Sequence, residues 1–417
     1  MQDTGSSVRE LRHVVVLVDQ FPKISETFVL NHILGLLERN IEVDIFAKDA
    51  SLEPLQHRSV NENRLLGRTH VISSRRRQTK RLALLRGLFA ATTRYPKALR
   101  HLSGFRIDSN FVLALAATAG LRDVVQIVHA HFGPNGLLAS KLIDSGAFPG
   151  AKLVTSFHGY DATSYVTQHG RECYAELFAS GDAFIANGKD MRDRLLRLGC
   201  EARKIAVVPI GVDPPALQER SHTTHLPTRI LSIGRLVEKK GHSYGLRAVA
   251  EVAKRYPDIE YHIIGEGPLR EPLDRLVRYL GLQKNVTFCG IADADSVAAA
   301  LDRADVLLTP SVTASNGDSE GMVVANMEAM ARKIAVVSTR HGSIPELIDE
   351  GISGLLCEEG DVRCLSRSLL AVIENDRLRD SLGRGGRAKI VAEHDRRRLE
   401  ARLVDIYNRL LRGLSPT

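Results

Sequence analysis

The chain has 417 residues, of which 44% are hydrophobic and 25% charged, and its formal net charge is +8. This is a globular composition, with enough length for two domains or three small ones. No run of 18 or more apolar residues occurs and residues 1–10 are polar, so we expect neither a membrane-spanning helix nor a secretion signal.

The five cysteines show no C-x-x-C pair and no histidine partner at zinc spacing. We therefore expect buried, reduced thiols and a cytoplasmic protein. The cysteines are Cys173, Cys200, Cys289, Cys357 and Cys364.

Apolar runs and helical periods alternate through the first half of the chain. This alternation favours a parallel sheet covered on both faces, and we assign it to an N-terminal domain, residues 1–212. The sequence predicts strands at 14–18, 41–46, 127–132, 153–157, 183–186 and 205–210, and helices at 25–38 and from 136 onward.

The loop after the first strand contains Ser25, Glu26 and Thr27 ahead of a helical segment. Ser25 is a suitable residue to cap that helix. The same three side chains could instead bind phosphate or the hydroxyl groups of a substrate in a cleft. Both interpretations remain open on the sequence.

A basic insertion interrupts this domain near residues 68–106. It holds 11 Lys and Arg and no acidic residue, and the rest of the chain carries 46 basic against 49 acidic residues. One helical face combines apolar with basic side chains, namely Leu82, Leu85 and Phe89 beside Arg81 and Arg86. Such a segment can lie on an anionic membrane surface, or it can be a solvated insertion. Without interleaved aromatic residues or a known motif, we expect no nucleic acid partner.

Two predicted strand ends of this domain carry histidines. His158 stands beside Gly159 after the strand at 153–157, where a histidine can hydrogen-bond a sugar hydroxyl or a phosphate, although a lone histidine is more often part of a core. His129 and His131 alternate on a neighbouring strand, and we expect one to face the cleft and the other the packed side. With no third ligand evident, they do not form a metal site on spacing alone.

The second half repeats the alternation more clearly. A Pro-rich polar stretch from 212 to 227 is interpreted as an interdomain linker. We assign 213–390 to a C-terminal domain and 391–417 to a helix that packs back toward the N-terminal domain. Two Rossmann-like domains would then face each other across a cleft, with ligands at the carboxyl ends of strands. The predicted strands are 229–233, 261–264, 286–289, 306–309 and 334–338, with a helix at 243–256.

Cations follow the first strand of this domain in a loop that runs from Gly234 to Gly241. Arg235 offers a planar fork for phosphate oxygens and Lys240 a point charge. The charge on a leaving nucleoside diphosphate grows as its bond to a sugar breaks, so cations placed here would stabilise the transition state. After the next strand, Gly265 and Gly267 could let the backbone approach a base or phosphate, or form a tight turn.

Two glutamates, Glu320 and Glu328, stand eight positions apart after the strand at 306–309. We expect a helix to open at Gly321, Met322 and Val323, whose free N–H groups would form an anion site. A ligand that reaches both carboxylates would be long, with phosphates in the middle and hydroxyls at both ends. A nucleotide sugar has this shape.

The segment Asp293-Ala294-Asp295 matches a D-x-D pattern that holds a divalent metal in some sugar transferases. It also precedes a helical segment, where acids complement the helix dipole. With cations already available for phosphates, we expect no metal and no cofactor.

Together these segments resemble the retaining GT-B glycosyltransferases of the group 1, family four type, most strongly between 230 and 357. The segments that carry the resemblance are Glu320 to Glu328, Gly234-Arg235-Leu236 with Lys240-Gly241, Gly265 to Leu269, and Gly342 to Glu346. The segments Phe21 to Phe28 and Phe157 to Asp161 are similar to the branch that builds bacterial exopolysaccharides such as colanic acid and amylovoran.

The resemblance implies a role for each candidate residue. Arg235 and Lys240 would hold the donor diphosphate, Glu328 the ribose, Glu320 the sugar hydroxyls, and His158 the sugar near its reacting end. The N–H groups of Gly321, Met322 and Val323 would touch the phosphates or the sugar. Many relatives have a glycine-rich loop after the first strand, which is absent here, so Ser25, Glu26 and Thr27 are expected on the acceptor side.

The predicted activity is retaining hexosyl transfer from a nucleoside-diphosphate sugar to a glycan on a polyprenyl diphosphate, at the inner face of the membrane. Two alternatives share the same ligand. One is a GT-B sugar epimerase, and the other is a non-catalytic protein that binds a nucleotide or glycan at the membrane.

Overall fold

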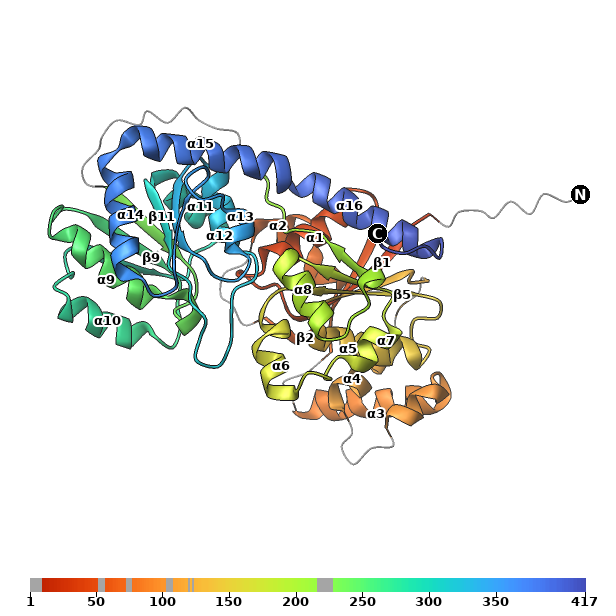
Figure 1. Cartoon of the computed structure of the whole chain (residues 1–417). Coiled ribbons are helices and arrows are strands. Elements are labelled where there is room, and N and C mark those ends of the chain that lie inside the picture. Colours follow the sequence, from red (N-terminus) through yellow and green to blue (C-terminus); the bar gives the residue numbers. More distant parts are fainter. Residues whose placement is uncertain are drawn as a thin grey trace, which may run out of the picture.

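The computed structural model describes residues 10–51, 57–72, 77–102, 108–118, 121, 124–215 and 228–417, without the side chains of 77–81. Within these residues the strands form two sheets, one of seven and one of six, and neighbouring strands pair in parallel. The sheets form two lobes that lie side by side (Figure 1). The prediction of two Rossmann-like parallel-sheet domains is therefore confirmed.

Each predicted strand is present, within a few residues of its expected bounds. β1 is nearly buried along its whole length, which explains its continuous run of valines. Strands β3 and β13, of three residues each, were not predicted because so short a segment has no clear period. The strands are β1 His13–Phe21, β2 Glu42–Ala50, β3 Thr69–Val71, β4 Ile127–His131, β5 Lys152–Phe157, β6 Ala183–Ala186, β7 Ile205–Val207, β8 Arg229–Ile233, β9 Glu260–Ile264, β10 Val286–Gly290, β11 Val306–Thr309, β12 Ala335–Thr339 and β13 Leu355–Cys357.

The strand orders are β3-β2-β1-β4-β5-β6-β7 and β10-β9-β8-β11-β12-β13. In each sheet the order reverses beside the first strand, between β1 and β4 and between β8 and β11. Ligands of such sheets bind outside the carboxyl ends of the strands at these switch points. The loops after β8 and β11 hold Lys240 and Glu320, so both predicted site segments lie at a switch point.

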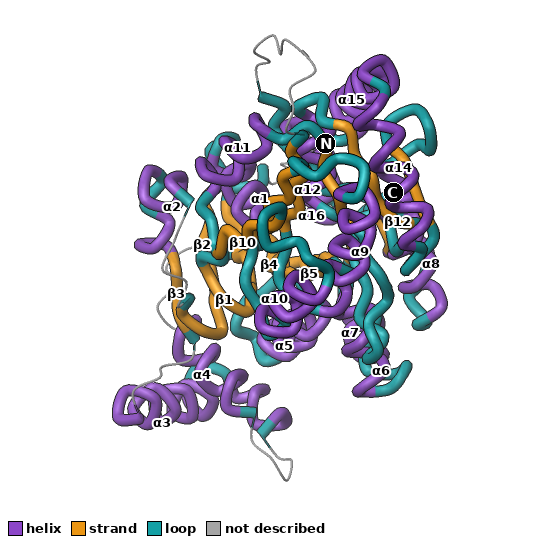
Figure 2. The backbone as a smooth tube through the Cα atoms, turned by 90° about the vertical axis from the view of Figure 1, so that its left-hand side faces the viewer, coloured by secondary structure: helices purple, strands orange, loops and turns teal. Residues whose placement is uncertain are grey.

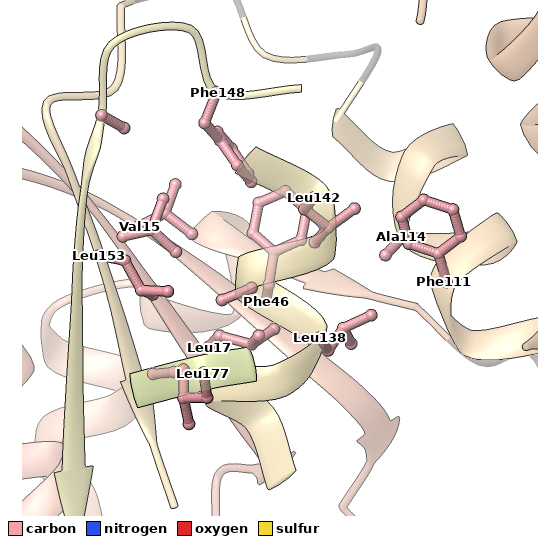
Figure 3. Packing of buried hydrophobic residues seen from close by; sticks show 14 of the residues in the cluster. Val15, Leu17, Phe46, Phe111, Ala114, Leu138, Leu142, Phe148, Leu153 and Leu177 are labelled. Atoms are coloured by element: carbon pink, nitrogen blue, oxygen red, sulfur yellow. The ribbon is translucent and has the colours of Figure 1, made fainter. Parts of the chain in front are cut away.

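Helices cover both faces of the first sheet. Helices α3, α4, α5, α7 and α8 pack on one face, and α1, α2 and α16 on the other. In Figure 3, Phe46 of β2 lies beside Leu142 of α5 and Phe148 in the first of these cores. The bounds are α1 Thr27–Leu37, α2 Arg58–Glu62, α3 Arg77–Thr93, α4 Ser109–Thr118, α5 Gly133–Asp144, α6 Ser164–His169, α7 Ala175–Ser180 and α8 Lys189–Arg197.

The second sheet is covered in the same way. Helices α9, α10 and α14 pack on one face, and α11, α12 and α13 on the other. The bounds are α9 His242–Ala253, α10 Arg270–Tyr279, α11 Ala294–Arg303, α12 Val324–Ala331, α13 Ile344–Leu347, α14 Val362–Glu374, α15 Asp376–Glu393 and α16 Arg396–Leu411.

Helices α15 and α16 cross from the second lobe to the first (Figures 1 and 2). Where they meet, the buried Arg396 forms ion pairs with Asp213 at 2.7 Å and Glu38 at 2.9 Å. Beyond it, α16 buries Tyr407 against α1 in the core of the N-terminal lobe. Of the predicted linker at 212–227, only 212–215 are among the described residues.

The cysteine prediction was wrong in part. Cys357 at the end of β13 and Cys364 on α14 form a disulfide, with Cα atoms 5.7 Å apart. Tertiary packing brings the two residues together although their spacing matches no motif. Of the other three thiols, Cys200 is buried, Cys173 is half-buried and Cys289 is exposed.

Candidate active site

The loop after β8, residues 234–241 and here called the lysine loop, is fixed against the end of β11. It closes with a 3-10 turn over Glu238–Lys240, followed by Gly241 at φ +63°. A Cβ on Gly241 would lie 1.8 Å from the carbonyl oxygen of Pro310. Both the backbone conformation and the close approach therefore require glycine, and the turn places its lysines beside the loop after β11.

The two lysines of this loop pair with acids of the loop after β11. Lys240 Nζ lies 2.8 Å from Glu320 Oε1, and Lys239 Nζ lies 3.1 Å from Asp318 Oδ1. Burial raises the pKa of Glu320, but the attraction of Lys240 and Lys239 outweighs it and leaves the pKa below its usual value. A ligand that takes phosphate to Lys240 and hydroxyls to Glu320 would therefore bind across a preformed ion pair. Sequence reasoning missed Lys239, which is the more buried of the two lysines.

Arg235 also stands in the lysine loop, but its side chain is exposed. It forms no ion pair with another residue in the described part of the chain. Its guanidinium is therefore available to an anionic ligand at the mouth of this loop.

His341 holds the backbone of Glu320 in place. The N–H of Glu320 donates to His341 Nε2 at 2.9 Å, and His341 Nδ1 donates to Glu359 Oε1 at 2.5 Å. These two bonds fix the imidazole tautomer. Beside it, Gly342 has φ +51°, and a Cβ there would lie 2.3 Å from the carbonyl oxygen of Glu320. His341 could have been predicted as a site residue from the sequence, because it follows the end of β12 by two residues.

Helix α12 begins at Val324 with Val323 as its N-cap residue, so it opens at the end of the predicted segment Gly321-Met322-Val323. The N–H groups of Gly321, Met322 and Val323 donate to no other described residue, and they precede the helix in a segment that bends at 321 and 322. Because Glu320 lies outside the helix, only Glu328 is placed by helical spacing. Burial raises the pKa of Glu328, with a smaller opposing effect from Arg332.

The two glycines after β9 serve the packing of loops. A Cβ on Gly265 would lie 2.0 Å from the carbonyl oxygen of Gly234, and a Cβ on Gly267 would lie 2.5 Å from that of Leu236. The N–H of Leu236 also donates to the carbonyl of Glu266 at 2.9 Å. The glycines thus let this loop lie directly on the lysine loop, and their contact with a ligand stays a prediction.

On the N-terminal side, His158 follows β5 in a turn built around Asp161. The buried carboxylate accepts from the N–H groups of His158 at 3.1 Å, Gly159 at 2.8 Å and Gly133 at 3.1 Å. Burial raises the pKa of Asp161 to about 6, although these hydrogen bonds oppose the shift. The turn therefore has one rigid conformation.

The His158 ring is held between aromatic neighbours and a second histidine. Its centroid lies 4.3 Å from that of Phe28 and 4.8 Å from that of Phe132, and its Nε2 lies 3.0 Å from His131 Nδ1. Burial, together with the nearby His32, lowers the pKa of His158 to about 3. The ring is therefore neutral near pH 7, able to donate or accept a hydrogen bond but carrying no charge.

The two lobes touch at this point. A Cβ on Gly321 would lie 1.9 Å from the carbonyl oxygen of His158, and a Cβ on Gly159 would lie 3.2 Å from the N–H nitrogen of Gly321. The fold therefore brings His158 together with the segment that holds Glu320, although the two are 162 positions apart in the sequence.

A second contact between the lobes lies nearby. Glu346 of α13 accepts from the N–H groups of Lys189 at 2.6 Å and Asp190 at 2.7 Å, which begin α8. A carboxylate at a helix N-terminus is favoured by the helix dipole and satisfies free N–H groups. Glu346 belongs to a motif of the family resemblance, but its partner in the other lobe could not be read from the sequence.

The predicted acceptor residues lie at the start of α1. Ser25 does not cap the helix: it is exposed, and Glu26 occupies the N-cap position without a side-chain capping bond. Glu26 Oε1 instead lies 2.5 Å from Lys23 Nζ. Thr27 is the first residue of the helix, one position before the Phe28 that contacts His158, so this segment borders the His158 side of the site.

The expectation that His129 and His131 face opposite sides was wrong. Residues two apart on a strand share a face, and both rings are buried with centroids 4.8 Å apart. Sequence reasoning also missed His32, which packs beside them from α1. The sequence could have indicated His32 because this histidine lies on the apolar face of that helix.

Of the two aspartates in the D-x-D segment, Asp293 caps α11 by accepting from the N–H of Ser296 at 2.8 Å.

Two family models together match most of the chain. The model described as Glycosyltransferase Family 4 matches residues 25–215, and the model described as Glycosyl transferases group 1 matches residues 217–389. Each therefore matches one lobe.

Full-length relatives are similar over nearly the whole chain. The amylovoran biosynthesis glycosyltransferase AmsK of Erwinia amylovora is 32% identical over 399 residues, which cover 94% of this chain and 98% of AmsK. The putative colanic acid biosynthesis glycosyltransferase WcaL of Escherichia coli is 35% identical over 388 residues, which cover 90% of this chain and 94% of WcaL.

Among solved structures, Anabaena HepE in complex with UDP-glucose has a TM-score of 0.72 at 15% identity, covering 96% of this chain and all of HepE. This likeness shows the fold alone, and the family rests on the sequence relatives. The chain belongs to the group 1, family 4 glycosyltransferases of GT-B fold, together with the enzymes of amylovoran and colanic acid biosynthesis.

Proposed function

We propose that this glycosyltransferase moves a hexose, with retention of configuration, from a nucleoside-diphosphate sugar to a hydroxyl of a lipid-linked glycan. The observation that carries the proposal is the ion pair of Lys240 and Glu320, 2.8 Å apart at a switch point. It stands beside the free N–H groups of 321–323, and the His158 turn of the other lobe lies against the same segment.

In this proposal the donor diphosphate lies between the lysine loop and the free N–H groups. Lys240 and Arg235 balance its charge, which increases when the bond to the sugar breaks. Glu328, which helix α12 places behind the free N–H groups, holds the ribose hydroxyls. No metal is needed for this charge balance.

Glu320 and His158 address the sugar from opposite lobes. Once phosphate engages Lys240, the carboxylate of Glu320 is free to accept from sugar hydroxyls. The neutral His158 ring avoids placing a positive charge beside a sugar that becomes cationic in the transition state. The leaving phosphate oxygen takes the proton of the acceptor hydroxyl on the same face, so no side-chain base is required.

The acceptor is proposed to be lipid-linked because of an unusual surface on α3. The side of α3 that packs on α4 carries small residues, and a Cβ on Gly87 would lie 2.0 Å from the carbonyl oxygen of Val112. The outer side carries large apolar groups, with Leu85 63% and Phe89 70% exposed. Helix α3 lies at the periphery of the N-terminal lobe (Figures 1 and 2).

Basic side chains are exposed on α3 and on the 3-10 helix Pro96–His101 that follows it. These are Arg86 and Lys97, while Arg75 and Arg76 lie outside the described residues. Apolar groups with a basic rim match an anionic bilayer surface. In the described part of the chain no helix is both long and apolar enough to cross a bilayer. We therefore propose docking on the cytoplasmic face of the membrane, with the acceptor reaching the cleft from there.

Sedimentation with lipid vesicles tests the docking. Each basic residue near an anionic surface contributes about 1 kcal/mol, so the double variant Arg86→Gln/Lys97→Gln should lower binding to phosphatidylglycerol vesicles about tenfold or more. Leu85→Ser/Phe89→Ser should lower it as well. Ile352→Ser, at an apolar residue that is 65% exposed on the other lobe, is the matched control. Unchanged sedimentation of both double variants would refute the docking.

Thermal-shift measurements with UDP, GDP and ADP sugars, followed by turnover without acceptor, test the activity. Slow release of free sugar and nucleoside diphosphate supports the transferase, and NMR of the anomeric centre of a transfer product reports retention. A sugar nucleotide converted to its epimer would indicate the epimerase instead. Binding of a sugar nucleotide with no turnover under any condition would indicate the non-catalytic protein.

A further inference from the structure

Four buried side chains and the half-buried His158 form one hydrogen-bonded cluster behind the candidate active site, here called the histidine network. Tyr407 Oη lies 2.9 Å from His32 Nε2, His32 Nδ1 lies 2.9 Å from His131 Nε2, and His131 Nδ1 lies 3.0 Å from His158 Nε2. A branch joins Tyr407 Oη to His129 Nδ1 at 2.5 Å. The network thus connects α16 to His158 through α1 and β4.

The histidines of the network are uncharged. Burial lowers the pKa of His32 to about 3, and burial with the neighbouring histidines lowers the pKa of His129 and of His131 well below the usual value. A neutral imidazole has one N–H and one acceptor nitrogen. Each ring that is bonded on both sides therefore donates on one side and accepts on the other.

This rule leaves only two arrangements of protons between Tyr407 and His158. In the first, Tyr407 donates to His32, His32 to His131, and His131 to His158 Nε2, so that His158 carries its proton on Nδ1. In the second, every bond is reversed, and His158 Nδ1 is a bare acceptor. A change at one end therefore changes the tautomer at the other.

The branch allows both arrangements. When Tyr407 donates to His32, it accepts from His129 Nδ1, and the reverse holds in the second arrangement. His129 Nε2 lies 2.8 Å from Ser156 Oγ, and a hydroxyl can donate or accept. The hydroxyl of Tyr407 is the only group that joins the two branches among the described residues, so it couples them.

The open end of the network is His158 Nδ1. This atom is buried and has no hydrogen-bond partner among the described residues, although buried polar atoms nearly always have one. It belongs to the residue whose carbonyl lies against Gly321 of the other lobe. An unpaired nitrogen here indicates a partner that arrives with the ligand.

We propose that the histidine network sets whether His158 Nδ1 donates to or accepts from the donor sugar, so that Tyr407, His32 and His131 are positioning residues for sugar transfer. The inference rests on the proposed function, in which His158 meets the sugar. The network lets His158 take either role without acquiring a charge, and it places one end of this control on α16, which joins the two lobes.

A metal ion is a poorer explanation of the same cluster. One ligand atom from each of His32, His129 and His131 lies within 4.8 Å of the others. However, His32 Nδ1 and His131 Nε2 are 2.9 Å apart, whereas two nitrogens on a tetrahedral zinc at about 2.0–2.1 Å stand about 3.3 Å apart. The shorter separation is that of a shared proton.

Tyr407→Phe tests the proposal because it removes only the hydroxyl. With the sugar nucleotide that the wild-type enzyme turns over, we expect kcat to fall about tenfold or more while KM for the donor stays within threefold. Spectra of ¹⁵N-histidine-labelled protein should show a changed Nδ1 signal of His158, three hydrogen bonds away from the removed group. Tyr261→Phe is the matched control, because Tyr261 is a buried tyrosine whose hydroxyl hydrogen-bonds Ser232 at 2.8 Å outside the network. The kcat of this control variant should stay within twofold of the wild-type value.

The outcomes separate this inference from the proposed function. If the wild-type enzyme turns over no sugar nucleotide, the proposed function fails, and the inference fails with it. If the wild-type enzyme is active, three results with Tyr407→Phe would refute the inference alone. These are an unchanged kcat, a loss of activity only in proportion to the unfolded protein, and an unchanged NMR signal of His158. One equivalent of tightly bound transition metal in the purified wild-type protein would also refute it, because the metal would occupy the lone pairs that the network shares.

Discussion

The α-carbon of Gly321 faces the carbonyl oxygen of His158 so closely that a Cβ would lie 1.9 Å from it. The two residues belong to different lobes. Gly321 is absent from the residues with positive φ, so its backbone conformation does not itself demand glycine. Glycine is therefore required at position 321 only because the two lobes approach each other so closely there.

Gly321→Ala should therefore impair catalysis and leave each lobe intact. The methyl group would hold the lobes apart by an ångström or more, and a misplacement of about 1 Å can cost about 100-fold in rate. We expect kcat/KM to fall about 100-fold with little change in the urea midpoint. Gly67→Ala, where nothing lies within 4 Å of the added Cβ, should keep kcat/KM within twofold. Wild-type turnover by Gly321→Ala would contradict closure at this contact.

Removal of either member of the Lys240–Glu320 pair should abolish transfer and destabilise the C-terminal lobe. Loss of Lys240 leaves the buried carboxylate of Glu320 without this partner, which costs about 3–5 kcal/mol for a buried pair. We expect Lys240→Ala and Glu320→Ala each to lower turnover at least about 100-fold. Measurements are initial rates and urea unfolding monitored by circular dichroism.

The double variant Lys240→Met/Glu320→Gln separates stability from catalysis. Because it leaves no unpaired buried charge, its unfolding free energy should return to within about 1 kcal/mol of wild type while turnover stays lost. Lys254→Ala, at an exposed pair with Glu251, should change neither quantity appreciably. Full activity in either single variant would overturn the site assignment.

Glu346→Gln should weaken the contact between the lobes. The carboxylate accepts from two N–H groups at the start of α8, and a charge at a helix N-terminus contributes about 1 kcal/mol. We expect the equilibrium between touching and separated lobes to shift about fivefold toward separated lobes. This shift would lower kcat/KM and increase the radius of gyration measured by X-ray scattering. Asp361→Asn removes the charge of a similar cap within one lobe, on α14, and should alter only stability. An unchanged scattering profile for Glu346→Gln would argue against this role.

Glu400 should make the protein less stable as pH rises. Burial raises the pKa of Glu400 to about 8 from 4.5, although Arg396 and Arg39 oppose the shift. Between these values the folded state binds the proton and the unfolded state has released it, so unfolding becomes easier by about 1.4 kcal/mol per pH unit. Glu400→Gln should flatten this slope and be more stable at pH 8.

Urea unfolding at pH 5, 6, 7 and 8 measures this slope. Glu271→Gln, at a glutamate whose side chain is 88% exposed, should retain the slope of the wild type. Parallel slopes for wild type and Glu400→Gln would show that Glu400 is ionised in the fold.

The sheet architecture could be predicted because its signals are local. The valine run in β1 and the helical period of α9 each appear within a dozen residues, and both elements lie where expected. Motifs such as Gly234-Arg235 were placed at strand ends by the same alternation. Helix α12 starts at Val324, directly after the predicted Gly321 to Val323, but the contact of Gly321 with the carbonyl oxygen of His158 could not be predicted because it joins the two lobes.

By itself, the amino-acid sequence determined two parallel sheets, the strand ends at which ligands bind, and the family of the enzyme, since apolar periodicity and short motifs depend only on neighbouring residues. Tertiary structure alone decided that Lys240 pairs with Glu320, that His158 meets Gly321, and that His32, His131 and Tyr407 join His158 in one network. These contacts join residues far apart along the chain, and which of them meet depends on how the packed helices and sheets position their side chains.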